Sequence, residues 1–376
     1  MPAINFVSLN PLGLLPLMRY IIPTLAQNKI VITTPHIEGF YTFQEFGVQR
    51  NTITFRNVDH LNSKSMWERV LQYYKSLTRI LGIVIPRRNA KIYLIDYQLV
   101  AFAIWLKKHI RKKLDIIYHQ FELFDPSIDR SLNKKLQYYV FKNAAWIDLV
   151  IFPETNRLLF FKEQSGLENI NYLIIPNTNN LHPVVGKDPL PDNLFSPEQI
   201  VIAHVGNVGT SHYIHSYLHF IENNHEANLR FLFIGFLESR VKQLIEKLSA
   251  SDHRVIYIEQ MPHDQLLQYY QRIDLGIILY KGVDKNNEFC APNKLYEYWA
   301  YGIPVIAHRL DGLTGIWKHD FMGELIDLES GEQIQEAIHK MIRLKKEYRP
   351  RLLEYFSREI AFNCYAPMLK NKIIGH

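Results

Sequence analysis

Short apolar runs alternate with amphipathic stretches along much of the chain, most regularly in its second half. Buried strands are predicted there at 199–206, 229–235, 254–259, 275–280 and 303–308. Residues 237–248 and 263–272, which lie between such runs, have the spacing typical of helices. Continuous apolar strands that alternate with helices indicate a parallel sheet covered on both faces. The second half therefore predicts a doubly wound α/β domain.

The first half repeats this pattern less regularly. Its strand candidates are INFVSLN, KIVITTP, KIYLID, LDIIYHQ, WIDLVIFP and NYLIIPN. A polar, proline-rich stretch at 177–199 separates the two series and is typical of a linker. We therefore expect two Rossmann-like domains, at 1–182 and 183–355, followed by a C-terminal segment at 356–376.

Composition supports two domains, because 376 residues with 47% hydrophobic and 21% charged residues are too many for one core. Two cysteines cannot form a disulfide framework, which favours a reducing compartment. The longest apolar run, Leu99 to Leu106, is too short to span a bilayer, and the first residues lack the pattern of a signal peptide. We expect a cytoplasmic protein.

Basic residues are concentrated in the first half. Residues 1–180 contain 22 Lys and Arg against 13 Asp and Glu, a balance of +9, whereas residues 181–376 contain 21 against 24, a balance of −3. Such an excess favours an anionic partner, although charge alone does not distinguish nucleic acid, a membrane surface and simple solvation.

In open parallel sheets, ligands bind beyond the carboxyl ends of the strands. HVGNVGTSHY, residues 204–213, follows this rule, because Gly206, Asn207 and Gly209 form a tight turn after a predicted strand. Thr210 or Ser211 is expected to cap the next helix, whose free N–H groups suit an anion. An ordinary strand-to-helix turn gives the same pattern.

NKLYEYWAYGIPVIA, residues 293–307, predicts a short helix, a glycine stop and another strand. Pro292 and Asn293 suit a helix start, so Lys294 lies in the first turn, where a phosphate is stabilised by the cation and by unpaired N–H groups. Glu297 lies one helical turn away on the same face and can accept hydrogen bonds from hydroxyls. The alternative is a surface ion pair worth a few tenths of a kcal/mol.

APNKLYEYWAYGIPVIA resembles the donor-binding segment of GT-B glycosyltransferases of the family-four-like group. VIYIEQMPHDQLLQYYQRIDLGIILY, residues 255–280, resembles the donor domain of the xanthan glucuronosyltransferase group. The resemblance implies the GT-B fold: two Rossmann-like domains facing each other across a cleft, with a C-terminal helix crossing back to the first. It also implies transfer of a sugar from a nucleoside diphosphate, UDP in particular, to a lipid-linked or polysaccharide acceptor.

The same resemblance assigns residues to the donor site. It implies that Met261 lies near the base, Lys294 near the diphosphate or sugar and Glu297 on the ribose, with Tyr280 lining the pocket. Asn207 and His212 stand where many of these enzymes have Arg and Lys, so neutralising the phosphates falls to Lys294 and backbone N–H groups.

A second departure concerns the familiar pair of glutamates separated by seven residues. Glu288 and Glu297 are separated by eight, so the usual retaining mechanism is not carried over. No Asp-x-Asp motif occurs in the chain, and hard cations need clustered oxygen ligands, so we expect no metal or other cofactor. His212, His215 and His219 are predicted to share one helix face, where packing is favoured over metal binding.

A general base is expected on the first domain, opposite the donor. IIYHQFELFDP, residues 116–126, ends a strand and runs into a loop, which makes His119, Glu122 and Asp125 the candidates. Glu122 is the acidic residue nearest in position to the catalytic Asp of the xanthan group. It is therefore the first choice of base, for an inverting transfer.

Two alternatives from other classes stay open. One is a nucleotide-sugar 2-epimerase of the same fold, and the other is a basic binding protein without chemistry. Nucleic acid is not the expected partner, because the basic residues are not interleaved with aromatics on a recognisable module. An apolar stretch precedes five cations, Lys107, Lys108, Arg111, Lys112 and Lys113, which suits contact with an anionic membrane surface, at the inner face of the membrane. The alternative is the solvated end of a helix that packs on its sheet.

Overall fold

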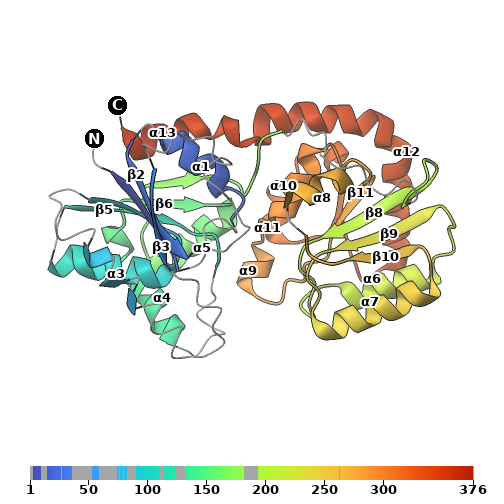
Figure 1. The fold of residues 1–376 in the computed structure, drawn as a ribbon, viewed down its shortest axis with the longest axis horizontal. Helices are drawn as coiled ribbons and strands as arrows, with labels where there is room; N and C mark the ends of the chain where they lie inside the picture. The colour runs from blue at the N-terminus through green and yellow to red at the C-terminus, as the bar shows by residue number, and fades with distance from the viewer. Residues whose placement is uncertain are drawn as a thin grey trace. The chain divides into compact units, whose positions relative to one another are not determined.

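The computed structural model describes residues 3–9, 15–26, 28–35, 53–58, 74–75, 77–78, 80–82, 90–110, 113–123, 132–181, 194–261 and 263–375. The chain divides into two compact units (Figure 1). Unit 1 comprises Met1–Asn177 and Tyr365–His376, and unit 2 comprises Thr178–Cys364.

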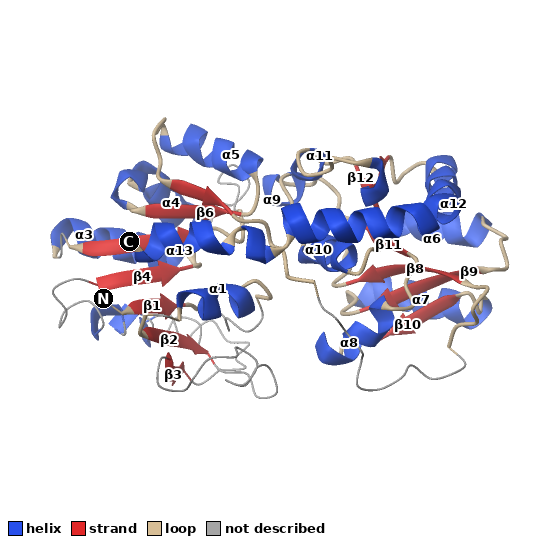
Figure 2. Ribbon diagram, turned by 90° about the horizontal axis from the view of Figure 1, so that it is seen from above, coloured by secondary structure: helices blue, strands red, loops and turns tan. Residues whose placement is uncertain are grey.

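Unit 1 is built on a seven-stranded parallel sheet in the order β3-β2-β1-β4-β5-β6-β7. Its strands are β1 (Ile4–Val7), β2 (Ile30–Pro35), β3 (Ile53–Val58), β4 (Ala90–Leu94), β5 (Leu114–His119), β6 (Leu149–Phe152) and β7 (Tyr172–Ile174). Its helices are α1 (Met18–Leu25), α3 (Tyr97–His109), α4 (Leu132–Lys142), α5 (Thr155–Ser165), α13 (Ala366–Ile374) and the short η3 (Ala144–Trp146). The helices α1 and α13 cover one face of the sheet, and α3 and α4 cover the other (Figures 1 and 2).

Unit 2 contains a six-stranded parallel sheet in the order β10-β9-β8-β11-β12-β13. Its strands are β8 (Ile200–Val205), β9 (Leu229–Ile234), β10 (Val255–Ile258), β11 (Leu275–Ile278), β12 (Val305–His308) and β13 (Gly323–Ile326). The main helices are α6 (Ile214–Asn223), α7 (Ser239–Ser251), α8 (His263–Tyr270), α10 (Asn293–Ala300) and α12 (Gly331–Tyr355). Two short helices, α9 (Lys285–Glu288) and α11 (Asp311–Thr314), also belong to this unit. Both sheets confirm the predicted α/β class.

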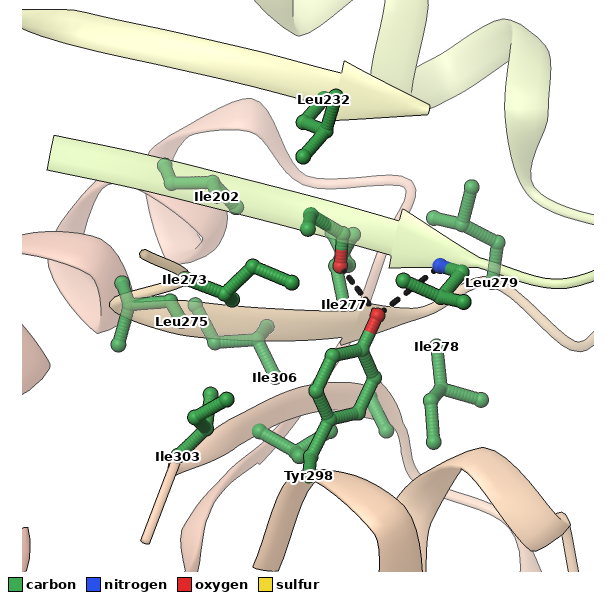
Figure 3. Packing of buried hydrophobic residues seen from close by; sticks show 14 of the residues in the cluster. Ile202, Leu232, Ile273, Leu275, Ile277, Ile278, Leu279, Tyr298, Ile303 and Ile306 are labelled. Atoms are coloured by element: carbon green, nitrogen blue, oxygen red, sulfur yellow. Dashed lines mark hydrogen bonds between the residues drawn. The ribbon is translucent and has the colours of Figure 1, made fainter. Parts of the chain in front are cut away.

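The strand order of unit 2 reverses between β8 and β11, and the pairing of these two strands ends at Gly276 and Ala203, before the carboxyl ends of both strands. The phenol of Tyr298 enters there, donating to Ala203 O at 2.7 Å and accepting from Val205 N at 2.9 Å (Figure 3). Gly276 makes this possible, because a Cβ atom there would lie 2.7 Å from the Tyr298 ring. A side chain of α10 thus replaces part of the ladder at the point where such sheets bind ligands.

All five apolar runs of the second half form strands in the structure. Two strands, β3 and β13, were not predicted: β3 carries Arg56 and Asn57, and β13 is only four residues long, so neither forms a clear apolar run. The expected cap of α6 was wrong, because this helix begins at Ile214 after Tyr213 rather than after Thr210 or Ser211.

Candidate functional site

The turn after β8 brings the backbone very close to the turn that follows β9. Gly206 has φ 136°, which favours glycine, and its N–H donates to Ile234 O at 2.8 Å. A Cβ atom on Gly235 would lie 2.3 Å from Gly206 O, so only glycine fits at both places. Asn207, at the top of this turn, is exposed.

Contacts with the loop after β9 hold the rest of this turn. Val208 N donates to Phe236 O at 3.0 Å, and Thr210 N donates to the Glu238 carboxylate at 2.9 Å. A Cβ atom on Gly209 would lie 2.9 Å from the same carboxylate. The glycine turn is therefore fixed within unit 2.

The helix α10 places a cation beside this turn. A Cβ atom on Gly206 would lie 3.8 Å from Cγ of Lys294, so the lysine side chain runs past the glycine. Lys294 Nζ lies 2.7 Å from Glu297 Oε2, so the two side chains form the i,i+3 ion pair that was the alternative to ligand binding. The side chains are 27% and 5% exposed respectively, so this pair differs from an ordinary surface ion pair.

The Glu297 carboxylate has a second donor from a separate helix. Tyr270 OH, at the end of α8, donates to Glu297 Oε2 at 2.5 Å. Burial first, and then the charge of Glu297, raise the pKa of Tyr270 well above its usual value, so the phenol stays neutral and donates. Beside the pair, Asn293 Oδ1 is buried without a hydrogen-bond partner among the described residues.

Two histidines that face this region were missed or misplaced by the sequence analysis. His204, in β8, is buried and bonds Ile277 O through Nδ1 at 3.0 Å, which leaves Nε2 without a partner within the described part of the chain. His212 accepts from Gly209 N at 3.2 Å through Nδ1, and its Nε2 is likewise buried and unpartnered there. The two rings lie 6.3 Å apart.

Burial lowers the pKa values of both imidazoles and so favours their neutral forms. Burial is the main cause that lowers the pKa of His204, to about 4, and proximity to His212 and Lys294 adds to the effect. Burial also lowers the pKa of His212. The two rings therefore offer an acceptor at His204 Nε2 and a donor at His212 Nε2.

The predicted helix face of three histidines is wrong. His212 precedes α6 and pairs in an isolated bridge with Tyr280, with the two rings 5.1 Å apart, whereas His215 and His219 lie exposed on α6. Within the described residues, no cluster of three or more His, Cys, Asp or Glu side chains is arranged to hold a metal ion. Met261 is half-buried against the core of unit 2, near the end of β10.

In unit 1, His119 is fully buried at the end of β5. Its Nδ1 lies 2.6 Å from Tyr93 OH, and its ring stacks on Phe121 at 4.0 Å. Burial lowers the pKa of His119 to about 3. Glu122 is exposed just beyond the strand, and Asp125 lies outside the described residues.

The basic stretch at 107–113 is only partly available for a partner. Lys107 is buried and pairs with Asp148 at 2.5 Å. Arg111 and Lys112 lie outside the described residues, and Lys113 is exposed before β5. Among the described helices, none combines the length and the apolar composition that crossing a bilayer requires.

Comparison with known proteins adds a family match. Residues 189–357 match the family model "Glycosyl transferases group 1". No curated protein sequence matches the chain, so the similarity to the xanthan glucuronosyltransferase group stays a prediction.

Solved structures resemble the whole chain. HepE of Anabaena, in complex with UDP and glucose, has a TM-score of 0.71 and 12% identity, with 100% of each chain covered. WaaG, a glycosyltransferase involved in lipopolysaccharide biosynthesis, has a TM-score of 0.69 and 14% identity, with 100% of each chain covered. The lipopolysaccharide outer core galactosyltransferase WaaB has a TM-score of 0.61 and 14% identity, covering 98% of this chain and 99% of that one.

At these identities the solved structures establish the fold, which is GT-B, and the family model covers most of unit 2. The glycine turn, Lys294 and Glu297 all lie within the matched residues. The chain therefore has the GT-B fold, and residues 189–357 of its second unit are similar to the glycosyl transferases group 1 family.

Proposed function

We propose that the protein transfers a sugar from a nucleoside diphosphate, UDP in particular, to a lipid-linked or polysaccharide acceptor. The observation that carries this proposal is the half-buried Lys294–Glu297 pair beside the Gly206 turn. Lys294 offers positive charge for a diphosphate, and the Glu297 carboxylate offers acceptor oxygens for ribose hydroxyls. HepE, a structural neighbour, was solved with UDP and glucose, which supports the choice of nucleotide.

Isothermal titration of the full chain tests the donor class. UDP and UDP-sugars should bind, and the same titrations with the ADP and GDP compounds should give weaker binding. A parallel assay with and without EDTA tests the expectation that transfer needs no metal or other cofactor, which rests on the lack of Asp-x-Asp motifs. Absence of binding by every nucleoside diphosphate would overturn the proposal.

Glu122 is the proposed general base, for an inverting transfer. It lies exposed at the carboxyl end of β5, where an acceptor hydroxyl could reach it. His119 is less suited, because a histidine with a pKa of about 3 is a weak base at neutral pH and its Nδ1 is occupied by Tyr93 OH. Asp125 remains a reserve candidate.

Replacing Glu122 with Gln keeps the shape of the side chain and removes its basicity. Turnover should fall by roughly 10²–10⁴-fold while donor affinity is preserved. The assay uses the acceptor and follows the anomeric configuration of the product by NMR, with Glu168→Gln, also exposed in unit 1, as the control. Near-normal turnover, or a product that keeps the donor's configuration, would contradict this role.

We also propose that the protein works in the cytoplasm and peripherally at the inner face of a membrane. A lipid-linked acceptor is confined to the bilayer surface, so an enzyme held there meets it more often. The basic excess of residues 1–180 supports an anionic surface as partner.

A further inference from the structure

We propose that the outer side of α3, α4 and η3 is the surface that binds an anionic membrane. This surface, named here the α3–α4 face, consists of Trp105, Lys108, Lys135, Tyr138, Lys142 and Trp146. The inference extends the proposed peripheral location by naming the contact surface, and it stands independently of the donor site.

Large aromatic side chains are exposed on this face, although nearby residues of the same helices are buried in the core. Trp105 is 43% exposed, Tyr138 54% and Trp146 36%. Leu106 and Val140, by contrast, are buried in the same helices. An exposed Trp or Tyr ring has a polar edge and an apolar body, which suits the boundary between water and lipid.

Cations accompany these rings at short range. Lys108 Nζ lies 5.9 Å from the Trp146 ring centroid and donates to Asn143 Oδ1 at 2.8 Å, which links α3 to the end of α4. Lys142 Nζ lies 5.3 Å from the Tyr138 ring. Two of the exposed rings therefore each lie beside a cation, and the contacts of Lys108 join α3 to the end of α4.

No acidic residue offsets these charges within the two helices. Neither α3 nor α4 contains Asp or Glu, and Lys135, Tyr138 and Lys142 share one side of α4 by their spacing. The nearby Asp148 carboxylate accepts from Lys107 Nζ and Ile116 N, so it is already engaged. The net positive charge makes an anionic partner the complementary one.

The contact surface overlaps only partly with the segment that the sequence predicted, because it shares Trp105 and Lys108 with it. The apolar stretch Leu99–Leu106 packs mainly into unit 1, and Lys107 is buried with Asp148. Lys107 therefore cannot contact a membrane. The exposed rings of Tyr138 and Trp146, which lie outside that stretch, contribute to the apolar part of the contact surface. A lipid surface satisfies both features of the face, because it offers anionic headgroups above an apolar layer.

Sedimentation of the full chain with vesicles tests the proposal. Vesicles of phosphatidylcholine with phosphatidylglycerol should bind the protein, and vesicles of phosphatidylcholine alone should bind it much less. The double variant Lys135→Glu with Lys142→Glu should lose at least about tenfold in binding to the anionic vesicles. Trp105→Ser should weaken binding at high salt, where the electrostatic contribution is screened.

Matched controls lie in unit 2. Arg240→Glu with Lys247→Glu makes the same change of charge on α7, and Leu244→Ser removes an apolar side chain of the same helix that is 38% exposed. Both controls should bind vesicles normally, and UDP titration should give unchanged affinity in all these variants, which separates this surface from the donor site. Equal loss in the controls, equal binding to neutral vesicles, or retention on DNA without vesicle binding would overturn the proposal.

Discussion

At the scale of single residues, Glu297 concentrates the chemistry of the candidate site. Its Oε2 atom accepts one hydrogen bond from Lys294 Nζ and another from Tyr270 OH. Side chains of two helices, α8 and α10, therefore meet at this oxygen. The lysine gains orientation from this contact, because a flexible ammonium group otherwise samples many positions. We infer that Glu297 both faces the ribose and holds Lys294 toward the diphosphate.

Removal of either charge tests this arrangement. Lys294→Ala and Glu297→Ala should each weaken UDP binding, since losing a charge-assisted contact costs about 1.5–3 kcal/mol. If Lys294 and Glu297 were only an exposed ion pair, removing one charge would change the measured free energy by less than about 1 kcal/mol. Lys242→Ala, which breaks the exposed pair with Glu259, is the comparison variant. Isothermal titration measures the affinities, and circular dichroism checks the fold. Wild-type affinity in both site variants would remove the basis of the proposed donor site.

Buried His204 predicts a dependence of stability on pH. Its pKa is lowered from 6.5 to about 4 in the folded chain, chiefly by burial. Between these values the unfolded chain binds a proton that the folded chain does not, so the free energy of unfolding falls as pH drops from 6.5 to 4. Above pH 6.5 this contribution does not change. The expected loss is on the order of 3 kcal/mol for this residue.

Urea unfolding at pH 7.5, 6.5, 5.5 and 4.5 measures that slope. His204→Gln keeps a donor for Ile277 O and removes the titration, so stability should depend less on pH in this variant than in the parent. His215→Gln, at an exposed position of α6, should leave the slope unchanged. His119 contributes in the same direction, so some slope should persist in the His204 variant.

At the scale of elements, the junction of α10 with β8 and β11 shapes the carboxyl edge of the second sheet. The Tyr298 hydroxyl bonds two backbone groups of β8 that would otherwise be buried without partners. Gly276 in β11 leaves the space for its ring. The strands therefore diverge at the switch point without unsatisfied backbone groups.

Tyr298→Phe separates the hydrogen bonds from the packing. The ring stays, but Ala203 O and Val205 N lose their partner, so the free energy of unfolding should fall by about 1–3 kcal/mol. Tyr269→Phe is the control, because Tyr269 is buried in the same unit and no hydrogen bond of its hydroxyl is found in the described structure. Equal effects of the two changes in urea unfolding would mean that the strand contacts add nothing.

Sequence spacing predicted those parts of the site that lie within one element. The i,i+3 relation of Lys294 and Glu297 follows from helical geometry, and the glycine turn follows from the residues themselves. Tyr270 could not be found in this way, because its contact with Glu297 joins two helices through the tertiary fold. His204 lay hidden in an apolar strand, where a single histidine gives no periodic signal.

The error over His212 has a physical reason as well. Residues 212, 215 and 219 have helical spacing, but the backbone at His212 pairs with Tyr280 before the helix begins. Tyr213 N donates a hydrogen bond to Leu279 O at 2.7 Å, which holds the segment before α6 against the end of β11. A tertiary backbone contact therefore overrode a local pattern, at the place where the ring points toward the site.

At the scale of the whole molecule, the chain contains two separate cores with different proposed tasks. The family match falls entirely within unit 2, whereas the basic excess belongs to the first half of the sequence. The chain passes between the units at Asn177–Thr178 and again at Cys364–Tyr365, after which α13 packs against α1 of unit 1. Each unit has the size and buried core of a domain that can unfold as its own cooperative block.

This division predicts how nucleotide affects thermal unfolding. A calorimetric scan of the full chain should show two transitions, and UDP should raise one of them, because a ligand stabilises only the block that binds it. At a UDP concentration 100 times Kd the gain is about 2.7 kcal/mol, which corresponds to about 5–10 °C for a unit of this size. Lys294→Ala should abolish most of that shift at the same concentration and leave the other transition unchanged. If UDP moves both transitions equally, nucleotide binding engages unit 1 as strongly as unit 2, and the assignment of the donor site to the second unit alone is wrong.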